Sequence, residues 1–208
     1  MKYLFFMVFS LILWFIYDRN VYNPFKDKNV IIVGNSKELL NRPLGEEIDK
    51  FDVVVRINNF EIDGYEKYAG TKTDAFHMNY ISIPKEHIQN VLSSNDIVWM
   101  GTRNIVRFTY RAGLNILDKR IQQYASGDYV CKNPTSGTMV LSTLMRQCNR
   151  PVTIVGLGGY SEPGYYYDEN PTVIDKNWKT AHNRHCPEIE QEFIENAIIA
   201  GKVKRLSV

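Results

Sequence analysis

Two glycine-containing turns in this 208-residue chain directly follow short runs of β-branched residues. Val30–Val33 leads into Gly34-Asn35-Ser36, and Val152–Val155 leads into Gly156-Leu157-Gly158-Gly159. A buried strand that ends in such a turn and opens a helix directs backbone N–H groups at one point, which is how α/β proteins hold a phosphate. The second turn does not complete a dinucleotide fingerprint, because Ser161 stands where the third glycine would fall. The turns therefore predict a phosphate-bearing ligand without naming it.

Polar residues also mark the ends of two other expected elements. Asn58 follows the apolar run Asp52–Ile57, and Ser136-Gly137 stands at the start of a helical pattern. In parallel sheets ligands bind at the carboxyl ends of the strands, so we expect these turns to be walls of one pocket. Simpler roles stay open for the same residues, since Asn35 and Asn58 also suit tight turns and Ser136 suits a helix cap.

The histidines and cysteines near the C-terminus allow a metal-site alternative. His182, His185 and Cys186 are of types that bind zinc, but no fourth ligand stands at a suitable spacing, so we expect no metal. With Cys131 and Cys148, the chain has three cysteines, which permit at most one internal disulfide and leave its pairing open.

Apolar and helical patterns alternate along the chain, and the composition, 44% hydrophobic and 23% charged, is that of a globular protein. We expect strands at Val30–Val33, Asp52–Ile57, Lys72–Met78, Asp96–Met100 and Val152–Val155, and Val203–Leu206 closes the chain. We expect helices at Lys37–Leu40 (ending near Pro43), at Phe108–Leu117, from Pro134–Gly137 to Cys148, and from Pro187 to Gly201. This alternation predicts an α/β fold, a single Rossmann-like domain of a GT-A-like variant with a mostly parallel sheet flanked by helices. The net charge of +2 predicts no nucleic-acid partner.

The N-terminal segment Tyr3–Tyr17 is apolar apart from Ser10. As a helix it is about 22 Å long, between a signal-peptide core and a full span of the roughly 30 Å hydrocarbon layer. No small residues suited to cleavage follow it. We therefore expect a short apolar helix that is an uncleaved membrane anchor (1–19), a polar tether (20–28) and an α/β domain (29–208).

Taken in order, four groups of residues resemble the motifs of one enzyme family. The first comprises Val33-Gly34-Asn35-Ser36, Gly45, Glu47-Ile48-Asp49, Asp52, Arg56-x-Asn58 and Gly70-x-Lys72-Thr73; the second comprises Pro134, Ser136-Gly137, Cys148, Val155-Gly156 and Gly158; the third is Tyr165-Tyr166-Tyr167-Asp168, and the fourth is His185 with Glu190. They resemble the long, short, third and very short motifs of the eukaryotic-type sialyltransferases, glycosyltransferase family 29. That family usually pairs the cysteine at the Cys148 position with one near Val30, which is absent here.

The resemblance implies transfer of sialic acid from CMP-sialic acid to a sugar hydroxyl, with inversion. An imidazole with a pKa of about 6.5 suits the removal of the acceptor proton at neutral pH, and we assign that role to His185. We expect Tyr165 and Tyr166 to protonate or hydrogen-bond the leaving phosphate. We expect the substrates to be bound by Gly34, Asn35, Ser36, Asn58, Ser136, Gly137, Gly156, Gly158 and Glu190. For Glu190, in the first turn of the last helix, a role in orienting the loop or capping the helix stays open.

The resemblance also bears on cofactors, partners and location. The chain has no Asp-x-Asp of the kind used in metal-dependent sugar transfer, so we expect no cofactor. The expected partners are a CMP-sugar donor, a glycan acceptor ending in galactose or GalNAc, and a membrane that holds the N-terminal helix as a type II signal-anchor, in the Golgi if the source is eukaryotic. Two alternatives stay open: transfer of another CMP-activated ulosonic acid such as Kdo, and a CMP- or glycan-binding protein without catalysis.

Overall fold

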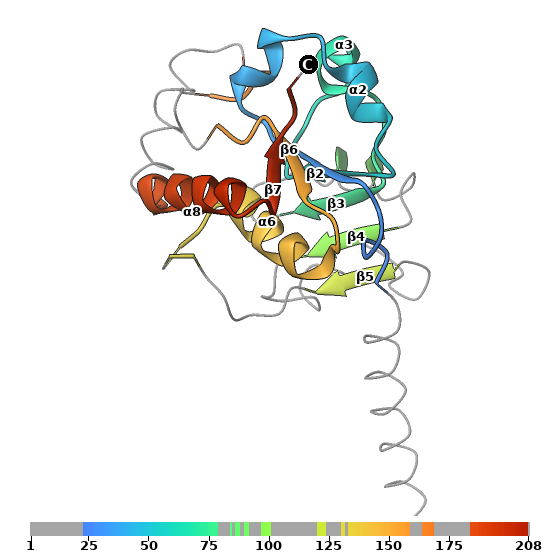
Figure 1. The fold of residues 1–208 in the computed structure, drawn as a ribbon. Coiled ribbons are helices and arrows are strands. Elements are labelled where there is room, and N and C mark those ends of the chain that lie inside the picture. Colours follow the sequence, from blue (N-terminus) through green and yellow to red (C-terminus); the bar gives the residue numbers. More distant parts are fainter. Residues whose placement is uncertain are drawn as a thin grey trace, which may run out of the picture.

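The computed structural model describes residues 23–78, 84, 86–87, 90–91, 97–100, 120–123, 130–131, 133–158, 164–168 and 184–207. A seven-stranded sheet lies at the centre, in the order β5-β4-β3-β2-β1-β6-β7, and each neighbouring pair of strands is parallel (Figure 1). The strands are β1 (Val30–Val33), β2 (Val53–Ile57), β3 (Ala75–Met78), β4 (Ile97–Met100), β5 (Arg120–Gln123), β6 (Val152–Val155) and β7 (Val203–Arg205).

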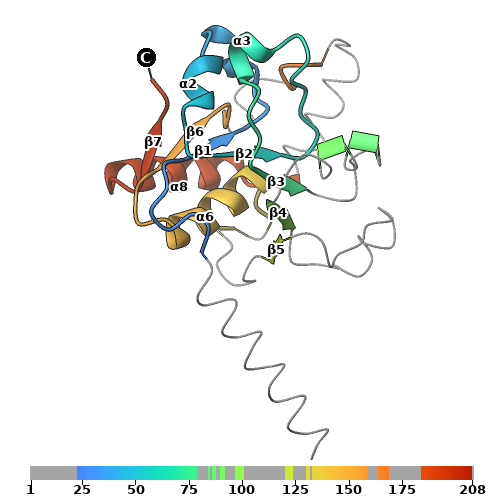
Figure 2. The same cartoon turned by 90° about the vertical axis from the view of Figure 1, so that its right-hand side faces the viewer.

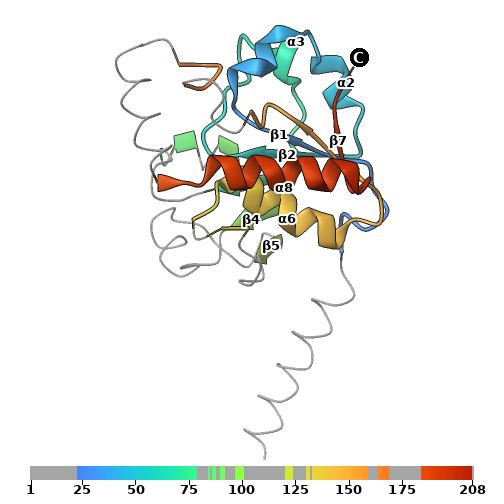
Figure 3. The same ribbon diagram turned by 60° about the vertical axis from the view of Figure 1, so that its left-hand side comes forward.

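Helices cover both faces of this sheet, as Figures 2 and 3 show. One face carries α6 (Ser136–Gln147) and α8 (Pro187–Ile199), and the other carries the 3₁₀ helix η1 (Lys37–Asn41) with α2 (Gly45–Asp49) and α3 (Glu66–Ala69). Alternate residues of each strand point to opposite faces. Val30 and Ile32 therefore pack in the core beneath α6 and α8, while Ile31 and Val33 pack in the core beneath η1, α2 and α3. The expected α/β architecture is confirmed.

The order of the strands places a topological switch point at β1. This strand pairs with β2 on one side and with β6 on the other, so the chain leaves it in one direction and later returns on the opposite side. In open α/β sheets the loops at such a point diverge and leave a crevice at the carboxyl ends of the strands. The turns after β1 and β6 both lie there.

Most expected elements are present, with the following differences. The third strand begins at Ala75 instead of Lys72. The Lys72 carbonyl accepts a hydrogen bond from the Arg56 side chain, and the Asp74 carboxylate accepts one from Val54 N, so these residues bond to β2 before the strand begins. Strand β5 was not predicted, since Arg120–Gln123 contains a single apolar residue. The short helices α2 and α3 and the closing strand β7 were also not predicted. The expected helix at Phe108–Leu117 lies outside the described residues.

The N-terminal boundary of the domain differs from the expected one. Residues 23–28 were assigned to a tether, but Phe25 is fully buried in the core, and Asn23 Nδ2 donates to the Gln147 carbonyl at 2.7 Å. An aromatic side chain in the core ties this segment to the domain. Residues 1–22, with the expected anchor, lie outside the described part of the chain, and no helix within the described part is long and apolar enough to cross a membrane.

Candidate active site

The turns after β1 and β6 touch through their backbones. Gly34 N donates to the Val155 carbonyl at 2.8 Å, and Ser36 N donates to the Gly156 carbonyl at 3.0 Å. A Cβ at position 34 would lie 2.1 Å from the Gly156 oxygen, and Gly156 itself has a φ of +67°. Both positions therefore need glycine, one for space and the other for conformation.

Leu157 joins these turns to the N-terminal end of α6. Its Cδ2 methyl lies 2.6 Å from a Cβ built at Gly34 and 2.8 Å from one built at Gly137. The Leu157 side chain therefore fills the space left by the absence of side chains at Gly34 and Gly137. It packs together the turn after β1, the turn after β6 and the start of α6, which are three of the expected walls of the pocket. Ser136 is half-buried beside Gly137 in the first turn of α6, and Gly158 follows in the Gly156 turn and is half-buried. Sequence reasoning did not single out Leu157, although its place between two glycines was a signal.

Asn35 holds the turn that follows β2. Its Nδ2 donates to the carbonyls of Ile57 at 2.9 Å and Asn59 at 3.0 Å. Asn58, between them, is in the left-handed region with a φ of 55°, and its N–H donates to the His77 carbonyl at 2.7 Å. The Asn35 amide therefore holds the backbone on both sides of Asn58. Asn58 itself has a left-handed conformation, which asparagine adopts more readily than most residues. The Asn35 Oδ1 is buried and has no hydrogen-bond partner among the residues described.

The tyrosine turn at residues 165–168 packs on the same two loops. Ser36 and Tyr165 form an antiparallel bridge, and Tyr166 N donates to the Asn35 carbonyl at 3.1 Å. The Tyr166 hydroxyl donates to the Glu61 carbonyl and accepts from Glu61 N at 3.0 Å. Burial raises the pKa of Tyr166 to about 12, and this side chain is only 4% exposed.

The two tyrosines with expected catalytic roles therefore differ in their placement. Tyr166 uses its hydroxyl to hold the backbone of the loop after β2, which leaves it no place on a leaving phosphate in this conformation. Tyr167 does the same through a hydrogen bond to the Asn59 carbonyl. Tyr165, in contrast, is 44% exposed and stacks on Tyr167 with ring centroids 5.5 Å apart. Only Tyr165 of the pair presents its ring to solvent.

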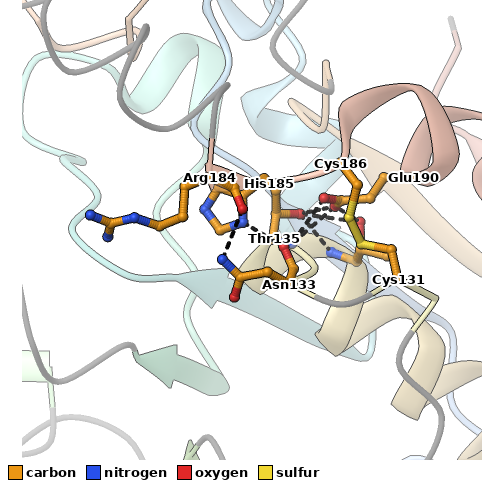
Figure 4. Close-up of a disulfide and its surroundings, with 8 residues drawn as sticks. Cys131, Asn133, Thr135, Arg184, His185, Cys186 and Glu190 are labelled. Carbon is orange, nitrogen blue, oxygen red and sulfur yellow. Dashed lines mark hydrogen bonds between the residues drawn. A yellow bond between two sulfur atoms is a disulfide. The ribbon is translucent and has the colours of Figure 1, made fainter.

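His185 lies just before α8 and contacts the segment that precedes α6 (Figure 4). Its Nδ1 is 2.8 Å from the Asn133 carbonyl, and Asn133 Nδ2 donates to the Arg184 carbonyl at 2.9 Å. Because a carbonyl only accepts hydrogen bonds, Nδ1 carries the proton of the neutral ring. Nε2 then carries the lone pair that a general base requires.

Glu190 lies on the first turn of α8 and points into the protein. The side chain is buried, and its oxygens accept from Thr135 N at 3.0 and 3.1 Å, from Thr135 Oγ1 at 2.5 Å, and from Thr138 Oγ1. The Glu190 carboxylate therefore links α8 to α6, which agrees with its expected role in orienting the loop before the helix. Thr135, not Ser136, caps α6, accepting from Thr138 N at 3.3 Å. The sequence signal that could have identified Thr135 and Thr138 as cap residues was their place in the run Pro134–Thr138, at the start of the expected helix.

The structure selects one of the possible disulfides. Cys131 pairs with Cys186 across 55 residues, and Cys148 is not in a disulfide. Burial raises the pKa of the Cys148 thiol to about 12. Cys131, Cys186 and Glu190 bring potential metal ligands within 4.8 Å of one another, but the disulfide occupies both sulfurs and the threonines occupy the carboxylate. Of the residues in the zinc alternative, His182 lies outside the described residues.

Other residues of the long-motif resemblance stabilise the fold. Arg56 is 1% exposed and donates to the carbonyls of Ala69, Gly70 and Lys72 at 2.9–3.2 Å. Burial lowers its pKa to about 10. Asp49 accepts from the backbone of Thr71 and Lys72, both at 2.9 Å. These contacts fix the connection from α3 to β3.

Residues 19–123 match the family described as glycosyltransferase family 29 (sialyltransferase), and they make up half of the chain. The chain belongs to glycosyltransferase family 29. This family 29 chain is 24% identical over 205 residues to the mouse CMP-N-acetylneuraminate-beta-galactosamide-alpha-2,3-sialyltransferase 2. That alignment covers 88% of this chain and 57% of the mouse protein, so the chain spans less than two thirds of that relative's length.

Solved sialyltransferase structures share the fold of this family 29 chain. A mammalian sialyltransferase in complex with Gal-beta-1-3GalNAc-ortho-nitrophenol superposes with a TM-score of 0.63 at 15% identity, over 86% of this chain and 69% of the other. The sialyltransferase CST-II in complex with CMP gives a TM-score of 0.56 at 16% identity, over 86% of this chain and 80% of that chain. At these identities the likeness establishes the architecture.

Proposed function

We propose that this family 29 chain is an inverting, metal-independent sialyltransferase that transfers sialic acid from CMP-sialic acid to a hydroxyl of a glycan. The observation that carries the proposal is the meeting of the Gly34 and Gly156 turns with the N-terminal end of α6 at the switch point of the sheet. Ligands of open α/β sheets bind at such points, and first-turn N–H groups of helices favour phosphate. The donor's CMP phosphate is proposed to bind there.

The half-buried polar residues around this junction supply further donors. Ser36 lies in the turn after β1, Ser136 lies in the first turn of α6, and Asn58 lies between the two residues whose carbonyls Asn35 binds. Neutral donors and backbone N–H groups stabilise the charge on a departing phosphate without needing a metal. Tyr165 is the tyrosine proposed to hydrogen-bond that phosphate, while Tyr166 and Glu190 position the loops around it.

His185 is proposed to be the general base. As the acceptor oxygen forms its bond to the reacting carbon of the sialic acid, the bond from that carbon to the phosphate oxygen breaks on the opposite face, and the acceptor proton passes to Nε2. The 2.8 Å contact from Nδ1 to the Asn133 carbonyl supports this role, because it fixes the tautomer that has its lone pair on Nε2.

The acceptor is proposed to be a glycan that ends in galactose or GalNAc. Two observations support it: the mouse relative is named for a beta-galactosamide acceptor, and the mammalian structure is a complex with a Gal-beta-1-3GalNAc compound. The Tyr3–Tyr17 segment is proposed to anchor the enzyme as a type II membrane protein, in the Golgi if the source is eukaryotic. The Cys131–Cys186 disulfide supports an oxidising compartment.

The proposal is tested by release of CMP from CMP-sialic acid with a panel of galactose- and GalNAc-terminated acceptors in the presence of EDTA. We expect turnover that EDTA does not reduce, and a fall of at least about 100-fold for His185→Ala with CMP binding retained. Glu188→Gln, an exposed change three residues later in the first turn of α8, is the matched control. Turnover of CMP-Kdo alone would reassign the donor. Tight CMP binding without turnover of any donor would contradict the enzyme and favour a binding protein.

A further inference from the structure

Two short segments on either side of the site are crosslinked three times around His185. Cys131 forms the disulfide with Cys186, Asn133 Nδ2 donates to the Arg184 carbonyl at 2.9 Å, and His185 Nδ1 contacts the Asn133 carbonyl at 2.8 Å. Figure 4 shows these contacts together, with the disulfide on the α8 side of the imidazole. All three crosslinks therefore join residues 131–133 to residues 184–186.

We propose that the Cys131–Cys186 disulfide positions His185, and that its reduction switches off the transferase activity proposed above, on which this inference rests. Cys186 directly follows His185 in the sequence, and Cys131 precedes Asn133 by two residues. The disulfide thereby holds the Asn133 carbonyl within reach of Nδ1, and so keeps the lone pair on Nε2. Cys131 and Cys186 are positioning residues that act through the imidazole.

The surrounding contacts confine the effect of reduction to this segment. Glu190, in the first turn of α8, bonds Thr135 and Thr138 through atoms that take no part in the disulfide. Pro187, Ile194 and Ala197 also keep α8 buried against the sheet layer. Reduction therefore removes the link next to His185 while the links between α8 and α6 persist, and the expected result is a loosened imidazole in a folded protein.

The third cysteine does not compete for the bridge. Cys148 follows α6 at its opposite end, and burial raises the pKa of its thiol to about 12. A thiol that stays protonated at neutral pH is a poor nucleophile for disulfide exchange. The switch is thus a two-cysteine couple: a dithiol reductant gives two electrons and two protons, the S–S bond breaks to give two thiols, and the reductant closes to its own disulfide. Oxidised glutathione reverses the reaction.

The test compares the oxidised full-length protein with the same protein after treatment with dithiothreitol, and with the Cys131→Ala/Cys186→Ala variant. Alkylation and mass spectrometry establish the state of the thiols. We expect kcat to fall by about tenfold or more, because small displacements of a catalytic group are costly. The KM for CMP-sialic acid should change by less than about twofold, since the donor site lies in the turns around Gly34. Activity should return on reoxidation.

A second readout does not depend on turnover. In protein labelled with ¹⁵N-histidine, the ring nitrogens of His185 should report the Nδ1–H tautomer when the disulfide is intact, and a mixture of tautomers after reduction. His185→Gln assigns the signal. Asn133→Ala, which removes only the contact to the Arg184 carbonyl, should shift the spectrum and kcat in the same direction by less. Cys148→Ala is the matched control and should stay fully sensitive to dithiothreitol.

The outcomes separate this inference from the proposed function. Full kcat in protein whose Cys131 and Cys186 are shown to be reduced would overturn the inference and leave the transferase intact. A rise in KM alone would also overturn it, since that would indicate a donor-site effect. Absence of turnover in the oxidised protein would contradict the proposed function, and an unchanged tautomer after reduction would then overturn the positioning role as well.

Discussion

The site is bounded by two junctions that are built in different ways. The β1–β6 junction is made by main-chain atoms, with Gly34 and Gly156 so close that neither tolerates a side chain without movement. The α6–α8 junction is made by side chains, through a disulfide and the buried carboxylate of Glu190. The first joins the two turns rigidly through their backbone hydrogen bonds, and the second holds His185, the proposed base. A binding wall can be fixed by the backbone alone, whereas a base needs support on its own side chain.

The largest expected effect breaks the main-chain junction. Gly34→Ala would place a methyl group 2.1 Å from the Gly156 oxygen, so the two strands must separate. We expect a loss of about 3 kcal/mol in the free energy of unfolding, measured by urea denaturation. Gly201→Ala is the control, because its φ is +69° but nothing lies within 4 Å of the added carbon. It should cost about 1 kcal/mol, and equal losses at the two positions would show that space is not the cause.

The side-chain junction is broken at Glu190. Glu190→Ala leaves the Thr135 N–H and two threonine hydroxyls without their acceptor in a buried place. We expect a loss of about 2–3 kcal/mol in stability and a lower kcat, measured by urea unfolding and by CMP release. The exposed carboxylate of Glu195, which pairs with Arg205 at 2.7 Å, is the comparison. Glu195→Gln should cost less than about 1 kcal/mol, and a larger loss there would contradict the contrast.

The two neighbouring tyrosines sharpen the contrast within a single turn. Tyr166→Phe removes the hydroxyl that serves the Glu61 backbone, so stability should fall by about 1 kcal/mol. Tyr165→Phe changes an exposed ring and should leave the unfolding midpoint unchanged. Its kcat should fall by about tenfold if its hydroxyl aids the leaving phosphate. The reverse pattern would exchange the roles of the two residues.

The smallest expected effect concerns a carboxylate outside both junctions. Burial raises the pKa of Asp49, but hydrogen bonds from the backbone of Lys72 and Thr71 outweigh it and hold the pKa below its usual value. A lowered folded pKa means that Asp49 contributes stability above its unfolded pKa of about 3.9, and that this contribution is lost as the pH falls through the folded value. The difference in urea midpoint between wild type and Asp49→Asn should therefore narrow from pH 7 towards pH 3. A constant difference would show that the ionised form makes no special contribution.

Local patterns were sufficient to predict most of the strands and the turns that follow β1 and β6. The β-branched runs Val30–Val33 and Val152–Val155 form β1 and β6, and the chain interrupts its first helical segment around Pro43, between η1 and α2. A strand of four apolar residues and a glycine turn are specified by near neighbours in the sequence, so they can be read from it. Strand β5 was missed because a short polar segment carries no such pattern.

The sequence by itself determined the parallel α/β design, the glycines of the crevice and, through its ordered motifs, the family. Only the tertiary structure decided that Cys131 pairs with Cys186, that Glu190 serves Thr135 and Thr138, and that Tyr166 faces a backbone while Tyr165 faces solvent. The physical reason is the distance along the sequence between the residues that interact. A turn is fixed by the allowed φ and ψ of adjacent residues, but a partner about 50 or more residues away is chosen by the packing of whole elements, which no local pattern encodes.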